Sequence, residues 1–368
     1  MPNGGAAQHI LIGFHDFNRG GTERIAIGMA RRWVDAGRRV TILCGSTGGG
    51  LRETVDPRVA VVETSPPHPR ALGSRLGLGK AMVPQAVALA PDVIFLPGNF
   101  HFIVAHALRR ALLHVPIVAK VSNPLLPGVP APVARLLRSA LTRFVAPIEA
   151  LVSMAPELVD EELAATRPAD TVIREPVLPA GHVALPRVQP DVPLILMLAR
   201  LEPQKNLPLA LQAFALLRQR RLARLLILGE GAERPRLEAV IARLNLGADV
   251  AMPGFSHEGA QALAQASALL LTSRYEGYPA VVVEALAADV PVVTTPCTPA
   301  LDGLIVTPMN GQVVEHATPN ALADALEAAL DLPFTSDNLR PDSVAHHDAA
   351  ASAQDYLALF DRLVQTRA

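Results

Sequence analysis

The chain of 368 residues has only two cysteines, and few of its residues are aromatic. Cys44 and Cys297 stand far apart in apolar surroundings, so we expect buried thiols and not a disulfide, which suits a reducing cytoplasm. No apolar run approaches the roughly 18 residues that a membrane-spanning helix needs. The first residues, MPNGGAAQHILIG, lack the basic start and long apolar core of a secretory signal. These absences predict a cytoplasmic protein.

The usual signs of metal and nucleic-acid binding are also missing. Asp-x-Asp occurs nowhere, and no group of His, Cys and Asp has the spacing of metal ligands, so no metal site is expected. The formal net charge of −1 combines +6 over residues 1–187 with −7 over residues 188–368. This asymmetry predicts two bodies with different partners, and neither is basic enough to indicate nucleic acid.

Apolar strand patterns alternate with helical patterns along the chain. HILIGF (9–14) precedes a polar, Gly-rich loop, a helical pattern that starts at Thr22, and a second strand pattern, RVTILC. The same rhythm restarts at PLILMLAR (193–200). The predicted fold class is α/β, with two doubly wound, Rossmann-like parallel-sheet domains. Such sheets bind ligands outside the carboxyl ends of their strands, so we expect the two domains to face each other across a binding cleft.

A proline-rich segment divides the two patterns. Residues 178–193 contain four prolines and no periodicity, which is typical of a linker. We therefore expect an N-terminal domain over residues 1–180, a linker over 181–192 and a C-terminal domain over 193–350.

Two glutamates mark the stretch YEGYPAVVVE (275–284). If Glu276 and Glu284 shared one helix, they would be roughly 80° and about 12 Å apart, which is too far for a close pair. Gly277 and Pro279 favour instead a loop that carries Glu276, followed by a helix that begins near Pro279. Such a helix start attracts anions, and carboxylates can accept hydrogen bonds from sugar hydroxyls. A helix with ordinary surface acids is the alternative on spacing alone.

Three further turns follow predicted strands. ARLEPQKN (199–206) places Arg200 and Lys205 where two fixed cations could hold a diphosphate, the alternative being a solvated turn. NRGG (18–21) precedes a helix, and its paired glycines would let amides approach a phosphate, although such turns are common. GEGAERPR (229–236) is half of a dinucleotide fingerprint. Its missing third glycine counts against a nicotinamide cofactor.

Together these motifs resemble the GT-B glycosyltransferases of family 4, which are retaining enzymes that use nucleotide-sugar donors. The resemblance rests on NRGGTER, PVLP, ARLEPQKN, ILGEG, PGF and YEGYPAVVVE, in this order along most of the chain. It implies that the N-terminal domain binds the acceptor and the C-terminal domain binds the nucleotide sugar. It also implies that residues 351–368, with SAQDYLALFDRL, form a final helix that packs back on the N-terminal domain.

The resemblance further implies roles for individual residues. Arg200 and Lys205 would bind the donor diphosphate, and Glu276 would hold the donor sugar. These three are the expected catalytic residues. Glu284 would bind the ribose hydroxyls. The other expected donor contacts are Gly277, Tyr278, Pro279, Gly20, Gly21, Gly254 and Phe255.

The chain departs from the family pattern at several points. Glu175 stands where members often have Asn, and Ser122 and Asn123 stand where many have a histidine. The sugar contact from that side is therefore assigned to Asn123 or to His101, although a loop histidine is more often merely solvated or capping. The glycine expected soon after Cys297 is also missing.

The expected function is transfer of a sugar from a UDP- or GDP-sugar to an acceptor hydroxyl, with retention of configuration, in polysaccharide, lipopolysaccharide or glycolipid synthesis. No cofactor or metal is expected, because fixed cations and helix-start amides would hold the diphosphate. No residue stands out as a covalent nucleophile, which favours a front-face reaction. The alternatives are a nucleotide-sugar epimerase, a nicotinamide oxidoreductase and a catalytically inactive sugar-nucleotide-binding module.

A basic amphipathic helix is predicted over residues 131–147. It places Arg135, Arg138 and Arg143 among leucines and Phe144, a pattern that can lie on an anionic membrane surface, where lipid-linked acceptors are found. A domain helix with arginines at its edge is the alternative. Peripheral contact with the inner face of the membrane is therefore a hypothesis for this cytoplasmic protein.

Overall fold

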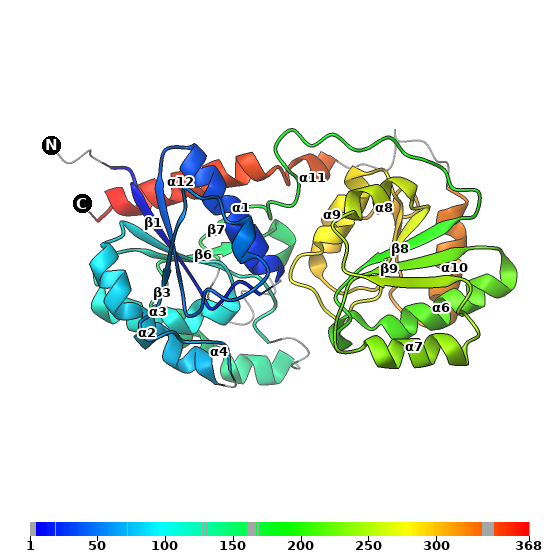
Figure 1. Ribbon diagram of the computed structural model, residues 1–368, viewed down its shortest axis with the longest axis horizontal. Coiled ribbons are helices and arrows are strands. Elements are labelled where there is room, and N and C mark those ends of the chain that lie inside the picture. The colour runs from blue at the N-terminus through cyan, green and yellow to red at the C-terminus, as the bar shows by residue number, and fades with distance from the viewer. Residues whose placement is uncertain are drawn as a thin grey trace. The chain divides into compact units, whose positions relative to one another are not determined.

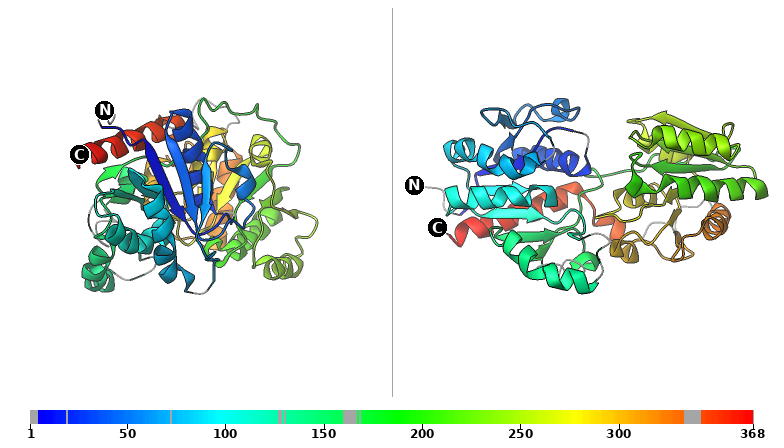
Figure 2. Two further views of the ribbon diagram at one scale, coloured as in Figure 1. Left: turned by 60° about the vertical axis from the view of Figure 1, so that its left-hand side comes forward. Right: turned by 90° about the horizontal axis from the view of Figure 1, so that it is seen from below.

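The computed structural model describes residues 5–18, 20–71, 73–126, 129, 131–159, 167, 169–332 and 342–367. The contacts divide the chain into unit 1, Met1–Ala180 with Asp348–Ala368, and unit 2, Gly181–His347. Each unit contains one parallel β-sheet with helices on both faces (Figures 1 and 2). The predicted fold class, two Rossmann-like parallel-sheet domains, is confirmed.

Unit 1 contains a seven-stranded sheet in the order β3-β2-β1-β4-β5-β6-β7. Its strands are β1 (His9–Phe14), β2 (Arg39–Cys44), β3 (Ala60–Glu63), β4 (Val93–Leu96), β5 (Ile117–Lys120), β6 (Ala150–Ser153) and β7 (Thr171–Val172). Its helices are α1 (Gly21–Asp35), α2 (Ser74–Leu89), α3 (Phe102–Ala111), α4 (Ala131–Val145) and α12 (Ala349–Gln365), with short 3₁₀ turns η1 (Arg52–Thr54), η2 (Asn99–His101) and η3 (Pro156–Leu158).

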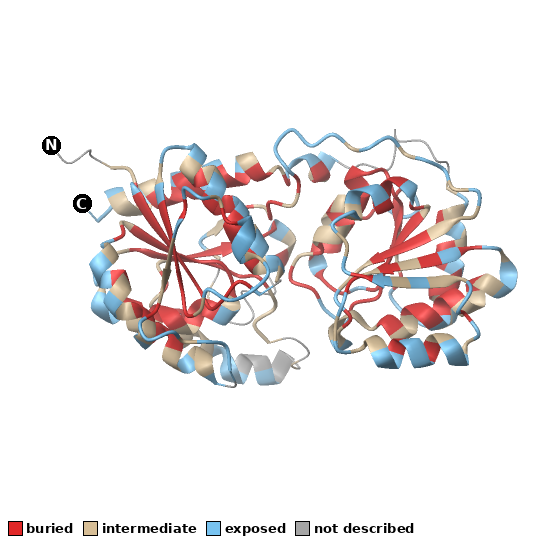
Figure 3. Ribbon diagram, viewed as in Figure 1, coloured by how far each residue is buried: buried red, intermediate tan, exposed pale blue. Residues whose placement is uncertain are grey.

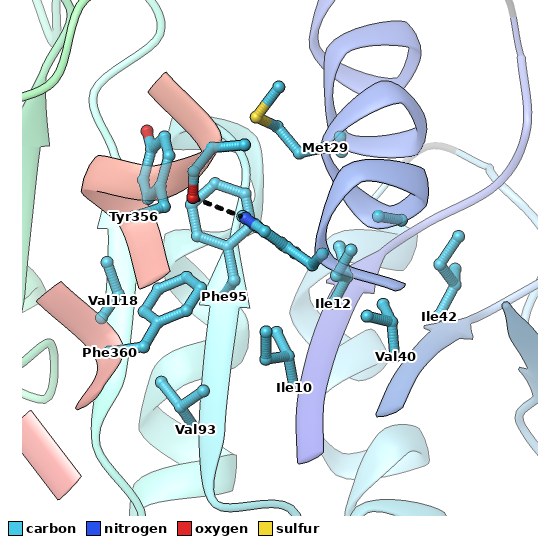
Figure 4. Close-up of a cluster of buried hydrophobic side chains, with 14 of the residues drawn as sticks. Ile10, Ile12, Met29, Val40, Ile42, Val93, Phe95, Val118, Tyr356 and Phe360 are labelled. Carbon is cyan, nitrogen blue, oxygen red and sulfur yellow. Dashed lines mark hydrogen bonds between the residues drawn. The ribbon is translucent and has the colours of Figure 1, made fainter. Parts of the chain in front are cut away.

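Both faces of this sheet are covered, which is why its strands are near-continuous apolar runs. Along β1, Ile10 and Ile12 point into one core and Leu11 into the other, because successive side chains alternate between the faces. Helices α1 and α12 cover the first face, and α2 and α3 cover the second. Tyr356 and Phe360 of α12 lie among side chains of the central strands (Figure 4). The last helix of the chain is thus part of the unit 1 core.

Unit 2 contains a six-stranded sheet in the order β10-β9-β8-β11-β12-β13. Its strands are β8 (Leu194–Leu198), β9 (Arg224–Leu228), β10 (Val250–Gly254), β11 (Ala268–Leu271), β12 (Val292–Thr294) and β13 (Gly311–Val313). Its helices are α6 (Leu207–Arg220), α7 (Arg234–Arg243), α8 (Gly259–Gln265), α9 (Ala280–Ala287), α10 (Pro319–Leu330) and α11 (Asp342–Ala345), with 3₁₀ turns η4 (Pro203–Lys205) and η5 (Pro299–Gly303). Helices α6, α7 and α10 share one core with the sheet. Strands β11 and β12 are buried throughout, whereas the edge strand β10 is partly exposed, and Figure 3 colours each residue by its burial.

In each sheet the strand order reverses beside the first strand of the unit. In unit 2 the chain runs outward through β8, β9 and β10, and then returns to place β11 on the other side of β8. In unit 1 the same reversal lies between β1 and β4. Loops leave the carboxyl ends of the two strands in opposite directions at such a point, and ligands bind there in open α/β sheets. The loops after β8, β11, β1 and β4 are therefore the first places to look for a site.

Cys44 and Cys297 are buried and are not joined in a disulfide, as expected. Burial raises the pKa of each thiol to about 12, so neither is a reactive thiolate at neutral pH.

No helix in the ranges that the structure describes combines the length and apolar character needed to cross a bilayer. The sequence after Ala155, PELVDEELAA (156–165), predicts a helix that begins with Pro156. The structure describes only the turn η3 there, and residues 160–166 lie outside the described ranges.

Candidate active site

Lys205 and Glu276 are in contact at the switch point of unit 2. Lys205 ends the turn η4 after β8, and Glu276 lies in the loop between β11 and α9. Nζ of Lys205 is 2.5 Å from Oε1 of Glu276, and both side chains are largely buried, at 16% and 11% exposure. Two motifs that are 71 positions apart in sequence thus form one ion pair.

Further groups hold the Glu276 carboxylate in place. The Ser273 hydroxyl donates to Oε1 at 2.5 Å, and the Glu276 amide donates to the Cys297 carbonyl at 2.8 Å. Among the described residues, Oε2 accepts only a long contact of 3.5 Å from the Gln204 side chain. One carboxylate oxygen is therefore fixed by two strong donors, while the other keeps capacity to accept a hydrogen bond from a ligand hydroxyl.

The loops after β8 and β11 are joined to each other as well. The Arg274 amide donates to the Gln204 carbonyl at 2.8 Å, and the Gln204 side chain donates to the Tyr275 carbonyl at 2.8 Å. The Thr272 hydroxyl donates to the Lys205 carbonyl at 2.9 Å. These bonds give the ion pair a rigid support. Gln204 was not predicted from the sequence, although its position next to Lys205 in the turn η4 was a usable signal.

Helix α9 begins directly after this loop. Its first residue is Ala280 and Pro279 is the capping position, so the helix starts one residue later than predicted. The Thr298 hydroxyl contacts the Gly277 carbonyl at 3.3 Å, which fixes the chain just before the helix start. Glu284 follows in the second turn of α9 and is half-buried. The predicted order, with one carboxylate in a loop and the other on the following helix, is the order in the structure.

Arg200 lies on the same loop as Lys205 but has a different partner. Its guanidinium donates to Oε1 of Glu202 at 2.5 Å, and its side chain is 54% exposed. Exposed ion pairs are worth roughly 0–1 kcal/mol, so the Arg200 guanidinium can leave Glu202 and bind another anion at little cost in free energy.

In the described part of the chain, no group of three or more His, Cys, Asp or Glu side chains is arranged to hold a metal ion.

The glycines after β9 are explained by packing within unit 2. A Cβ atom at Gly229 would lie 1.9 Å from a main-chain oxygen of the β8 loop, and one at Gly231 would lie 2.3 Å from another. Arg234 occupies the position of the third fingerprint glycine, and its guanidinium binds the Glu230 carboxylate. These glycines therefore let the loops after β8 and β9 touch each other.

Gly254 is the last residue of strand β10, which lies beside β9, and Phe255 follows it. Gly254 has a φ of +106°, which favours glycine, and a Cβ atom there would lie 2.8 Å from a Glu230 oxygen. The Phe255 ring is 49% exposed and meets the His257 ring edge-on, with centroids 4.8 Å apart. Both residues lie at the carboxyl edge of the sheet, as do Lys205 and Glu276.

In unit 1 the predicted glycines lie at the start of α1. Gly20 is the capping position, and a Cβ atom there would lie 2.2 Å from a Glu23 carboxylate oxygen. A Cβ atom at Gly21 would meet nothing within 4 Å, so packing within the described residues does not require a glycine at that position.

An ion pair that the sequence analysis missed lies next to this turn. Nε of Arg70 donates to Asp16 at 2.7 Å, and the Asp16 side chain is 4% exposed. Burial alone would raise the pKa of Asp16, but the hydrogen bonds from Arg70 and from the Asn18 amide outweigh it, so the pKa is lowered. Asp16 is therefore ionised at neutral pH. The only sequence signal for a role of Asp16 was its position two residues before the Gly-rich turn NRGG (18–21).

His101 and Asn123 lie after β4 and β5. His101 is 3% exposed, and its Nδ1 has no hydrogen-bond partner among the described residues. Burial first, and then the neighbouring Arg70, lower the pKa of His101 to about 3, so its ring is neutral at pH 7. Asn123 is half-buried, and its carbonyl accepts from the Asn99 amide group at 2.5 Å. His101 can serve a ligand only as a neutral imidazole.

The replacement His101→Gln should make stability less sensitive to acid. A histidine whose pKa falls on folding binds a proton more readily in the unfolded state, so stability is lost as the pH falls from about 6.5 toward about 3. Between pH 6 and pH 4, the wild type should lose about 1.4 kcal/mol more per pH unit than the variant. Urea titrations at several pH values measure this difference, and parallel curves for both proteins would contradict the assignment.

Two protein-family models match the chain. Residues 19–172 match the model described as Glycosyltransferase Family 4, and residues 186–343 match the model described as Glycosyl transferases group 1. The first match lies in unit 1, and the second lies in unit 2 and contains the Lys205–Glu276 pair.

Among curated proteins, the N-acetylgalactosamine-N,N'-diacetylbacillosaminyl-diphospho-undecaprenol 4-alpha-N-acetylgalactosaminyltransferase of Campylobacter jejuni is 30% identical over 151 residues. The match covers 41% of this chain and 41% of that relative, so it spans about two fifths of the relative's length.

Solved structures show the same two-domain fold. Sucrose-phosphate synthase from Thermosynechococcus elongatus has a TM-score of 0.76 at 16% identity, and the match covers 97% of this chain and 99% of that chain. Anabaena HepE in complex with UDP-glucose has a TM-score of 0.67 at 19% identity, with 97% of each chain covered. With a family model matched in each unit and this shared fold, the chain belongs to the GT-B glycosyltransferases of the group 1 and family 4 type.

Proposed function

We propose that the protein is a retaining glycosyltransferase that moves a sugar from a nucleotide sugar to an acceptor hydroxyl in cell-surface glycan or glycolipid synthesis. The observation that carries this proposal is the Lys205–Glu276 pair at the switch point of unit 2, directly before the start of α9. A cation, a carboxylate with one available oxygen and a helix start are the groups needed to hold a phosphate next to a sugar.

In this proposal unit 2 binds the donor. The Lys205 ammonium and the start of α9 neutralise the diphosphate, and Arg200 joins them by exchanging Glu202 for a phosphate oxygen. Glu276 accepts a hydrogen bond from the sugar, and Glu284 accepts from the ribose hydroxyls. The donor is a UDP- or GDP-sugar, and the UDP-glucose complex of HepE favours UDP. The fixed cations make a metal unnecessary for holding the diphosphate.

The reaction takes place on one face of the sugar. As the bond between the anomeric carbon and the phosphate oxygen breaks, positive charge develops on the ring and negative charge on the phosphate. Lys205 and Arg200 stabilise the phosphate, Glu276 stabilises the ring, and the departing phosphate accepts the proton of the attacking hydroxyl. No residue of the sequence stands out as a covalent nucleophile, which favours this front-face route over a covalent intermediate.

Unit 1 binds the acceptor in this proposal. Asp16 and the neutral His101 lie after the two strands at its switch point, where they can accept hydrogen bonds from acceptor hydroxyls. The curated relative acts on a diphospho-undecaprenol substrate, as its name says, which supports a lipid-linked acceptor.

A screen of nucleotide sugars tests the proposal. Thermal-shift measurements against UDP- and GDP-sugars should find one donor that stabilises the protein selectively, because a ligand that binds only the folded state raises its melting temperature. Transfer to a polyprenyl-diphosphate glycan should then give a product with the anomeric configuration of the donor, read from the proton coupling constant. An inverted product excludes retention, and donor conversion without acceptor would point to an epimerase.

We further propose that α4 lies on an anionic membrane surface. Leu136 is 81% exposed, Val133 and Leu137 are also exposed, and Arg138 and Arg143 lie on exposed positions of the same helix. The side chain of Arg135, the third predicted arginine, lies outside the described residues. Apolar side chains can enter the interface while arginines contact anionic head groups.

The double replacement Leu136→Ser with Leu137→Ser should reduce binding to vesicles of phosphatidylglycerol and phosphatidylcholine about tenfold or more, because each buried leucine contributes roughly 1.5–3 kcal/mol. Vesicle co-sedimentation measures this loss. Leu113→Ser, which alters an exposed leucine after α3, serves as the control. A wild type that stays in the supernatant at low salt would exclude the membrane proposal.

A further inference from the structure

The loop that carries Glu276 is held at two places. Its first half is fixed by the bonds from Ser273 and Lys205 to the Glu276 side chain. Its second half has a separate anchor, because the hydroxyl of Tyr278 lies 2.7 Å from Nε2 of His347. The two rings also pack together, with centroids 5.0 Å apart at 41°. His347 is 0% exposed and Tyr278 is half-buried, so the hydrogen bond is partly shielded from water and is worth more than a bond at the surface.

His347 is itself held firmly. It follows α11, which packs against α9, and its amide donates to the Val344 carbonyl at 3.1 Å. The Ser343 hydroxyl donates to the Gly303 carbonyl at 2.6 Å, and the Val344 side chain is 1% exposed. The segment therefore presents the imidazole from a fixed support, and the bond restrains Tyr278 more than it restrains His347.

The position of Tyr278 matters for the start of α9. Its carbonyl accepts from the Ala280 amide at 3.0 Å, and the Pro279 carbonyl accepts from the Val282 amide at 2.8 Å, so the first turn of the helix is built on this residue. A shift of the Tyr278 ring would move the helix start, where the proposed function places the donor diphosphate, while Ser273 and Lys205 still hold the Glu276 carboxylate. The expected effect is therefore on donor binding.

We infer that His347 is a positioning residue, which acts through Tyr278 to hold the donor-binding loop and the start of α9 in place. This inference rests on the proposed function. His347 does not touch the Lys205–Glu276 pair in any described contact, and it lies more than sixty positions beyond it in sequence. It is also the last residue of unit 2, and the next residue, Asp348, caps α12 in unit 1 by accepting from the Ala350 amide at 2.7 Å.

Steady-state kinetics with varied donor test the inference. Tyr278→Phe and His347→Ala should each raise the KM for the donor about tenfold, the size expected for one lost hydrogen bond, with kcat and the acceptor KM within about twofold. The donor KM of the double variant should be no higher than that of either single variant, because each replacement removes the same contact. His347→Gln, which can place an amide near the former Nε2, should recover most of the loss.

The matched control is His346→Ala, because His346 is an exposed neighbour on the same segment. It should leave every kinetic constant unchanged. If the wild type transfers sugar but Tyr278→Phe and His347→Ala change only the melting temperature, the contact is merely structural and the inference fails alone. A hundredfold loss in the double variant would show independent roles and also overturn it. If the wild type neither binds nor transfers any nucleotide sugar, the proposed function fails, and the inference fails with it.

Discussion

Replacement of Lys205 by alanine should lower kcat/KM for sugar transfer about a thousandfold, which is the upper end of the loss seen when one preorganised charge-stabilising group is removed. Lys205 is the largely buried cation of the site, and it is already fixed at 2.5 Å from Glu276 before a donor arrives. A fixed ammonium stabilises the departing phosphate most in the transition state, where the negative charge is greatest. The main loss should therefore appear in kcat.

The fold should survive this change, because main-chain and Gln204 hydrogen bonds still join the two loops. The melting temperature should fall by about 5–10 °C, because the largely buried Glu276 carboxylate loses its counter-charge, and circular dichroism of the folded state should be unchanged. Lys80→Ala, at an exposed lysine of α2, is the matched control and should keep full activity. A Lys205→Ala enzyme that retains more than a tenth of the wild-type rate would remove Lys205 from the mechanism.

The isosteric replacement Glu276→Gln should lower kcat about a hundredfold, with a smaller effect on the donor KM. The amide oxygen can still accept from Ser273 and Lys205, so the loop should keep its shape while the negative charge is lost. If the carboxylate stabilises positive charge on the sugar ring, the loss must appear chiefly in the chemical step. Single-turnover kinetics with saturating donor separate that step from binding.

Glu315→Gln provides the control for loss of an acidic charge in the same unit, because Glu315 is an exposed residue beyond β13. It should leave kcat unchanged. A Glu276→Gln enzyme with a raised donor KM and a normal kcat would show that Glu276 only binds the donor in its ground state, and the proposed charge stabilisation would then be wrong.

Much of the fold could be predicted from sequence, because both sheets are parallel and covered on both faces. Strands such as β1, β8 and β11 are therefore uninterrupted apolar runs, and the loops that follow them contain glycine, proline and charge. Helix α2 was harder to recognise, since Gly77, Gly79 and Pro84 interrupt its pattern. It forms because its apolar residues pack against α3 and the sheet.

The site was predictable as separate motifs but not as a set of contacts. Gly277 and Pro279 predicted that Glu276 lies in a loop and Glu284 on the following helix. The contact between Glu276 and Lys205, however, depends on β11 lying beside β8, which no local pattern indicates. The anchor at His347 had no sequence signal, because a histidine before a helix cap is ordinary.

One departure from the family pattern also has a structural explanation. Glu175, where members often have Asn, accepts from the Lys120 ammonium at 2.7 Å, and the two side chains are 6% and 2% exposed. A buried carboxylate needs such a partner, and the pair connects the end of β5 to the segment after β7. The negative charge of Glu175 is therefore balanced by Lys120, which lies 55 positions away in sequence.

A crystal structure with a bound nucleoside diphosphate, UDP first, tests the central claim most directly. The account predicts diphosphate oxygens within hydrogen-bond distance of Lys205 Nζ and of main-chain amides at the start of α9, with the ribose at Glu284. A diphosphate bound to unit 2 away from the loops after β8 and β11, with the Lys205–Glu276 pair untouched, would contradict it.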